Sequence, residues 1–228
     1  ALQIEIQHLL SDLNRRNQQL ESFKGIGQAK FRNKSRRMSS RIAWAGSNDG
    51  KLRIDLLAAS GHPVASLSND GQFLYVLSHF DERFYKKRTR NANLRQFFNM
   101  PIKTTDLITL LGGRVPVVEH DFAELKSEPK AKGFVIVLKK YWHGTVEKIH
   151  LDETKTEVKS VELLRSNELM FRINFAGNLI VDQFQIPKTV QVTNGDTIHF
   201  QLTIDRYWVN PMLSSQLFVL QPPDSRRG

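Results

Sequence analysis

The sequence predicts a mainly β protein, with one antiparallel sheet of about ten or eleven strands, a helix at the N-terminus and a helical insertion. Apolar and polar residues alternate through four successive runs between Ser39 and Tyr75, separated only by turns of Gly, Asn, Asp and Ser. The alternation resumes after residue 133. Between the two stretches, apolar residues recur at spacings of three and four, which is typical of helices.

The N-terminal segment, residues 1–22, predicts an amphipathic helix, because its apolar residues stand among Gln, Asn, Arg and Glu: Leu2, Ile4, Ile6, Leu9, Leu10, Leu13 and Leu20. The front strands are expected over residues 23–88, and the first of them spans about 23–33. Ser47-Asn48-Asp49-Gly50 suits a hairpin turn, since Asn, Asp and Gly tolerate positive φ. Further turns at 60–63 and 68–71 indicate five or six strands in meander order.

Residues 89–115 predict two short helices joined at Pro101, with Thr104 and Thr105 as a cap signal. After a polar stretch at 124–132, the back strands are expected over 133–220, at 134–138, 146–151, 158–164, 169–175, 179–186, 197–204 and 217–220. Hairpin turns are expected at 176–178 and 193–196. The two strand-rich stretches are too similar in texture to indicate two domains, so we predict a single domain over 1–228.

The composition is that of a basic globular protein. Lys and Arg number 33 against 23 Asp and Glu, a formal net charge of +10, which favours an anionic partner such as phospholipid headgroups or nucleic acid. The chain has no cysteine, so it forms no disulfide or thiolate metal site. It contains no apolar run of about 18 residues, and it begins at Ala1 without Met, so we expect any targeting segment to have been removed.

Two clusters of basic residues stand out: Lys30, Arg32, Lys34, Arg36, Arg37 and Arg41, and then Arg83, Lys86, Lys87, Arg88, Arg90 and Arg95. If the clusters adjoin, they form a patch for anionic headgroups, with Arg36, Arg37, Lys86, Lys87, Arg88 and Arg90 as the contacts. A merely solvated strand face is the alternative. Nucleic acid is the least favoured partner, although Phe84 and Tyr85 interleave with the second cluster, because no nucleic-acid motif accompanies the charge.

An enzymatic function is not expected. The seven histidines are scattered, and Glu119-His120-Asp121, the densest polar cluster, is typical of a surface strand end. Gly25-Ile26-Gly27 lacks the third glycine and the helix of a dinucleotide-binding loop, so a bend in a curved strand is the better interpretation. We therefore predict no catalytic residue, no metal site and no cofactor.

Specific residues resemble a known family over nearly the whole chain. They are Arg41-Ile42-Ala43-Trp44, then Leu52–Leu57, Gly61–Leu67 and Asp70-Gly71 in the front strands, Phe98–Ile102 with Leu107, Leu110 and Leu111–Pro116 in the insert, and Asn210 with Phe218–Pro223 at the end. This pattern resembles the LolA/LolB family of periplasmic lipoprotein carriers and outer-membrane lipoprotein receptors, in its LolB-like branch. One departure is the loop Ala58–His62, which lacks the large apolar tip of LolB-like receptors.

The resemblance implies an incomplete antiparallel β-barrel whose concave apolar face is covered by helices and holds the acyl chains of lipids or lipoproteins. The insert at 89–115 would be the lid. Each methylene that enters such a cavity contributes about 0.8 kcal/mol. The candidate cavity residues are Ile42, Trp44, Ile54, Leu56, Leu67, Phe73 and Tyr75 in the front, Phe97, Phe98, Leu107 and Leu111 in the lid, and Phe134, Ile136, Phe171, Ile173, Phe200 and Leu202 behind.

The expected function is therefore non-catalytic binding of lipid or lipoprotein by a monomer in the periplasm, anchored to the outer membrane through an N-terminal lipid. The alternative is an interaction scaffold whose cavity is filled by its own side chains. For any one of the candidate residues, plain core packing is favoured over ligand contact, and a bulge would exchange the two faces of a strand.

Overall fold

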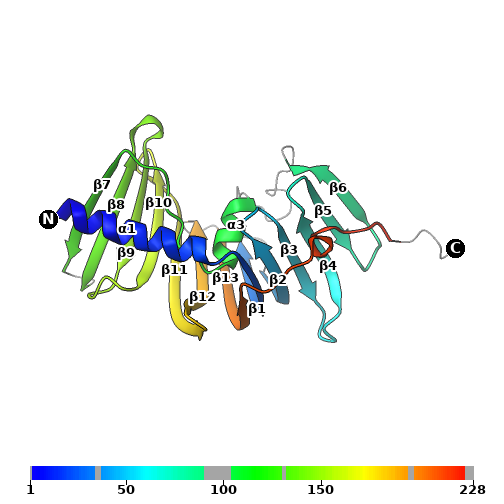
Figure 1. The fold of residues 1–228 in the computed structure, drawn as a ribbon. Coiled ribbons are helices and arrows are strands. Elements are labelled where there is room, and N and C mark those ends of the chain that lie inside the picture. Colours follow the sequence, from blue (N-terminus) through cyan, green and yellow to red (C-terminus); the bar gives the residue numbers. More distant parts are fainter. Residues whose placement is uncertain (1, 34–36, 90–103, 130–131, 195–197, 224–228) are drawn as a thin grey trace.

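The computed structural model describes residues 2–33, 37–89, 104–129, 132–194 and 198–223. Within them, thirteen antiparallel strands form one sheet in the order β6-β5-β4-β3-β2-β1-β13-β12-β11-β10-β9-β8-β7 (Figure 1). The sheet is open, because its two edges, β6 and β7, are not paired with each other. The protein is thus mainly β, as predicted, and an incomplete rather than a closed barrel.

The element bounds follow the chain. The helices are α1 (Leu2–Gln19) and α3 (Thr104–Leu111), and the strands are β1 (Ser22–Asn33), β2 (Arg37–Ser47), β3 (Leu52–Leu57), β4 (Pro63–Asn69), β5 (Phe73–Ser78), β6 (Phe84–Arg88), β7 (Phe122–Glu128), β8 (Gly133–Lys140), β9 (Thr145–Leu151), β10 (Val158–Arg165), β11 (Glu168–Val181), β12 (Phe184–Asn194) and β13 (Ile198–Val209). Two short 3₁₀ turns, Tyr141–His143 and Ser215–Phe218, complete the described elements.

The first and last strands meet at the centre of the sheet. The front meander runs outward from β1 to β6, and the back meander returns from β7 to β13, which pairs with β1 from Phe23 opposite Val209 to Asn33 opposite Ile198. Asn210 strengthens this junction: its Oδ1 accepts from the N–H of Glu21 at 2.8 Å, and its Nδ2 donates to the carbonyl of Gln19 at 3.0 Å. Asn210, near the C-terminal end of the chain, therefore fixes the connection between α1 and β1.

One face of the sheet carries both helices, and we call it the inner face. α1 lies across the back strands, and α3 lies against the front strands (Figure 1). Ile6 and Leu10 of α1 are buried against back-strand residues such as Ile149, while Leu107 and Leu111 of α3 join the front cluster around Trp44. The inner face is continuous and apolar because inward residues recur with the period of two that strands impose.

The C-terminal segment covers part of the opposite face, the outer face. Ser68 Oγ donates to the carbonyl of Phe218 at 2.7 Å, and Phe218 is 1% exposed. Leu220 packs with Tyr75 and Leu77 in a separate small cluster. Among the described helices, none is long and apolar enough to cross a membrane.

Most predicted elements are confirmed, and three are corrected. Residues 217–220 were expected as a strand, but 215–218 form a 3₁₀ turn. Two strands, 169–175 and 179–186, were expected with a turn at 176–178, and this turn is wrong. β11 instead runs without interruption to Val181, because its pairing with β12 resumes beyond Gly177, whose φ is +63. β7 lies in the stretch that was interpreted as polar, since it is an edge strand with a solvent face. The first helix of the insert falls outside the described residues.

Candidate ligand-binding site

The structure places most of the predicted cavity residues on the inner face. Those that belong to its two large clusters are Ile42, Trp44, Ile54, Leu56, Leu67, Leu107, Leu111, Phe134, Ile136, Phe171, Ile173, Phe200 and Leu202. Phe97 and Phe98 lie outside the described residues. Phe73 and Tyr75 are corrected: they belong to the outer-face cluster with Leu77 and Leu220.

The front members of this set form a packed core beneath α3. Trp44 is 3% exposed and Leu111 is 2% exposed. Trp44 Nε1 donates to the carbonyl of Leu111 at 3.0 Å, and the Tyr207 hydroxyl donates to the carbonyl of Gly112 at 3.0 Å. The sheet thus satisfies the carbonyls that the end of a helix leaves without an intrahelical partner. Trp44 positions α3, and its side chain packs in the core cluster.

An open cavity lies elsewhere on the inner side, between the C-terminal half of α1, residues 112–115, the turn at 156–159 and the β11–β12 hairpin. Its volume is about 310 Å³, at the lower end of the range for small-molecule pockets. The apolar part of its lining comes from Leu13, Leu20, Val115, Val158, Phe175, Phe184, Ile186 and Pro187. None of the predicted cavity residues lines this cavity. Its walls come from four other segments, which are far apart in the sequence.

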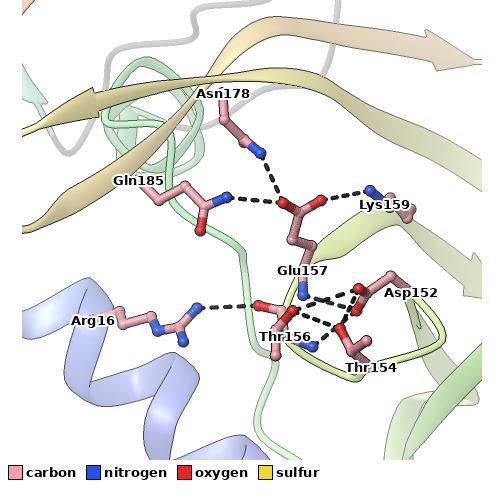
Figure 2. A network of polar contacts seen from close by, with 8 residues as sticks. All are labelled: Arg16, Asp152, Thr154, Thr156, Glu157, Lys159, Asn178 and Gln185. Atoms are coloured by element: carbon pink, nitrogen blue, oxygen red, sulfur yellow. Dashed lines mark hydrogen bonds and ion pairs between the residues drawn. The ribbon is translucent and has the colours of Figure 1, made fainter.

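A polar network borders this cavity (Figure 2). Glu157 Oε1 accepts from Asn178 Nδ2 at 2.8 Å and from Gln185 Nε2 at 2.9 Å, while its Oε2 accepts from Lys159 Nζ at 2.5 Å. The hydrogen bond from Lys159 is the main cause that lowers the pKa of Glu157. Arg16 of α1 reaches over to the carbonyl of Thr156 at 3.4 Å. The network joins α1, β10, β11 and β12 around one opening.

The turn that presents Glu157 is organised by Asp152. Asp152 Oδ1 accepts from the N–H groups of Thr156 at 2.8 Å and Glu157 at 3.0 Å. Desolvation raises the pKa of Asp152, but hydrogen bonds from the Glu157 backbone and the Thr154 side chain outweigh it and bring the pKa to about 2. The carboxylate therefore holds the turn over the whole neutral range (Figure 2).

Arg114 lines the cavity from the end of α3. The N–H of Gly113 donates to the carbonyl of Leu110 at 3.0 Å, and the N–H of Arg114 donates to the carbonyl of Thr109 at 2.9 Å. With Gly113 at φ +64, this is a Schellman motif, which fixes where the next side chain leaves the backbone. The Arg114 guanidinium packs 5.7 Å from the centre of the Phe23 ring, and its Nη2 donates to the carbonyl of Leu20.

Residues 115–118 form a strap that crosses from α3 towards β7. Asn17 Nδ2 of α1 donates to the carbonyl of Val115 at 2.7 Å, and the N–H of Val118 donates to Glu147 Oε2 at 3.0 Å. Glu147 is 1% exposed, and burial raises its pKa to about 7. Glu147 was not identified from the sequence as a buried residue. The alternation in β9 could have done so, because Glu147 lies on the same face of the strand as Ile149 and Leu151.

The basic clusters do not adjoin in the described part of the chain. Arg37 begins β2, whereas Lys86, Lys87 and Arg88 lie on the edge strand β6, with β3, β4 and β5 between them. Lys86 Nζ lies 4.2 Å from the centre of the Phe73 ring on the outer face. Arg36 and Arg90 lie outside the described residues. Across those same ranges, no group of His, Asp and Glu is arranged to hold a metal ion.

Comparison with known proteins identifies the fold. No protein-family model and no curated protein sequence matches the chain. Among solved structures, a putative outer membrane lipoprotein-sorting protein domain from Vibrio parahaemolyticus is similar with a TM-score of 0.63 and 12% identity, covering 92% of this chain and 94% of that one. A LolA superfamily protein from Nitrosomonas europaea gives a TM-score of 0.62 at 10% identity, with 94% and 97% covered.

A DUF1329 family protein from Desulfovibrio piger is also similar, with a TM-score of 0.65, 7% identity, and 94% and 97% of the two chains covered. At these identities the likeness establishes the fold alone. The chain has a LolA-like fold, which confirms that part of the predicted resemblance. The comparison does not single out the LolB-like branch.

Proposed function

We propose that this chain, a protein of LolA-like fold, is a non-catalytic lipid-binding protein that holds an acyl chain in the cavity between α1, Arg114 and the β11–β12 hairpin. The observation that carries the proposal is that cavity: about 310 Å³ of open space, with a lining that is part polar and part apolar, on the face that both helices cover. Burial of methylenes there supplies affinity without any catalytic group.

The solved neighbours support the cellular setting of the proposal. Two of them are described as an outer membrane lipoprotein-sorting protein domain and a LolA superfamily protein. We therefore propose that the chain acts in the periplasm, in traffic of lipids or lipoproteins towards the outer membrane. The LolB-like branch, the N-terminal lipid anchor and the monomeric state remain predictions, as does contact of Arg37 and Lys86–Arg88 with an anionic surface.

A pair of matched substitutions tests the site. Val158 lines the cavity, whereas Val64 on β4 is 41% exposed and far from the cavity lining. Val158→Phe fills part of the cavity and should weaken binding of a fluorescent polyene fatty acid about tenfold, a loss equivalent to about two methylenes. Val64→Phe adds the same volume elsewhere and should leave binding unchanged. Equal affinities for both variants would refute the site.

The scaffold hypothesis keeps one specific observation in its favour. The front residues that were expected to line a cavity are packed: Trp44, Ile42 and Leu111 are each 3% exposed or less. Native mass spectrometry of the purified protein separates the two functions. A bound lipid, or saturable uptake of the fluorescent fatty acid, supports the carrier; repeated recovery of empty protein without uptake supports the scaffold.

A further inference from the structure

Arg114 is a charged side chain in the wall of this cavity, whose lining is part polar and part apolar, and it has no carboxylate partner among the described residues. The one hydrogen bond from its guanidinium goes to the carbonyl of Leu20. Its Nε is buried and has no hydrogen-bond partner. Desolvation is also the main cause that lowers its pKa. A guanidinium offers five N–H donors, so most of this donor capacity is unused.

The position of Arg114 is imposed by the fold. The Schellman motif at the end of α3 sets its backbone, and the Phe23 ring supports the guanidinium at 5.7 Å. The carboxylate that shares the cavity, that of Glu157, is engaged by Lys159, Asn178 and Gln185 instead. The charged residues of the lining are Arg16, Arg114, Lys159 and Glu157, which leaves an excess of positive charge.

A cation withdrawn from water without a counter-ion is costly, and the cost is recovered when an anion binds. Guanidinium groups match carboxylates and phosphates, because two neighbouring N–H groups can bond two oxygens of the anion. An acyl chain in the apolar part of the cavity would bring an anionic headgroup within reach of this donor. A neutral headgroup offers no comparable partner.

We propose that the ligand is an anionic amphiphile and that Arg114 is the residue that recognises its carboxylate or phosphate headgroup. This inference rests on the proposed function, since it names the ligand class of the same cavity. Arg16 and Lys159, at the border of the cavity, add attraction but not recognition, because Arg16 is exposed to solvent and Lys159 pairs with Glu157.

The test compares three ligands that share a sixteen-carbon chain: hexadecanoate, hexadecyl phosphate and the neutral monohexadecanoyl glycerol. Each displaces the fluorescent fatty acid at pH 8 from the full chain, from Arg114→Gln and from Arg16→Gln. Glutamine removes the charge and keeps an amide donor on a shorter side chain. The unfolding midpoint in urea confirms that each variant is folded, and Arg114→Met, which also removes the charge, replaces Arg114→Gln if that variant does not fold.

We expect Arg114→Gln to weaken binding of the two anions about tenfold and to leave the neutral ligand unchanged, while Arg16→Gln changes all three by less than about threefold. A preference for phosphate over carboxylate, or the reverse, identifies the source of the headgroup. Equal losses for anionic and neutral ligands, or no loss in a folded variant, overturn the role of Arg114 but leave lipid binding intact. If no ligand binds the natural chain, the proposed function itself fails.

Discussion

Replacement of Glu147 by glutamine should change how the stability of the protein depends on pH. Glu147 is 1% exposed on the inner face of β9, where its cross-strand neighbours are Leu138 and Leu163. Its carboxyl group accepts a hydrogen bond from the N–H of Val118 in the strap, at 3.0 Å. Glutamine is close to isosteric, keeps an oxygen to accept that hydrogen bond and cannot ionise.

The size of the effect follows from the pKa. Burial raises the pKa of Glu147 from 4.5 to about 7, so the unfolded chain ionises first as the pH rises. Below about pH 4.5 the group is protonated in both states and has no effect. Between pH 4.5 and 7 the folded state loses stability, by about 3 kcal/mol in total, since one pKa unit corresponds to about 1.4 kcal/mol. Above pH 7 the loss levels off.

The assay is urea unfolding, followed by circular dichroism, at pH 4.5, 6 and 8. Other carboxylates also titrate, so the informative quantity is the difference in unfolding free energy between Glu147→Gln and the natural chain. We expect this difference to grow from near zero at pH 4.5 to about 3 kcal/mol in favour of the variant at pH 8. Glu168→Gln, at an exposed position at the start of β11, is the matched control and should show no such trend. A difference that does not vary with pH would refute the reasoning.

Three further substitutions test the contacts that hold the covering elements in place. Trp44→Phe removes the donor to a buried carbonyl at the end of α3 and should cost about 1–3 kcal/mol of unfolding free energy, measured in urea. Gly113→Ala places a Cβ at φ +64 and 3.0 Å from Pro187, so a loss of at least about 1 kcal/mol is expected; an unchanged midpoint would contradict the Schellman assignment. Asn210→Ala breaks the hydrogen bonds that join the end of α1 to β1, and we expect amide exchange at residues 21 and 22 to accelerate, with little change in the back strands.

The sequence anticipated the sheet more closely than the site. Alternation is a local property, so Ile42, Trp44 and Ile54 could be assigned to one face before any partner strand was known. It failed at β5, where Phe73 to Leu77 are apolar at every position. The reason is that β5 is covered on both faces: Leu74 packs in the inner core, and Leu220 from the C-terminal segment packs on Tyr75.

By itself, the sequence determined an N-terminal helix, a mainly β fold with one apolar face to cover, and a basic surface. These features depend on the hydrophobic period and on the composition, both of which can be determined from residues that are close together in the sequence. The tertiary structure decided that the predicted cavity residues under α3 pack as core, and that an open cavity forms beside Arg114. That cavity depends on contacts between α1, the end of α3 and the β11–β12 hairpin, and the partial burial of Arg114 depends on which segments cover it. A local sequence pattern does not show which of these distant segments come together, and so it does not predict a cavity between them.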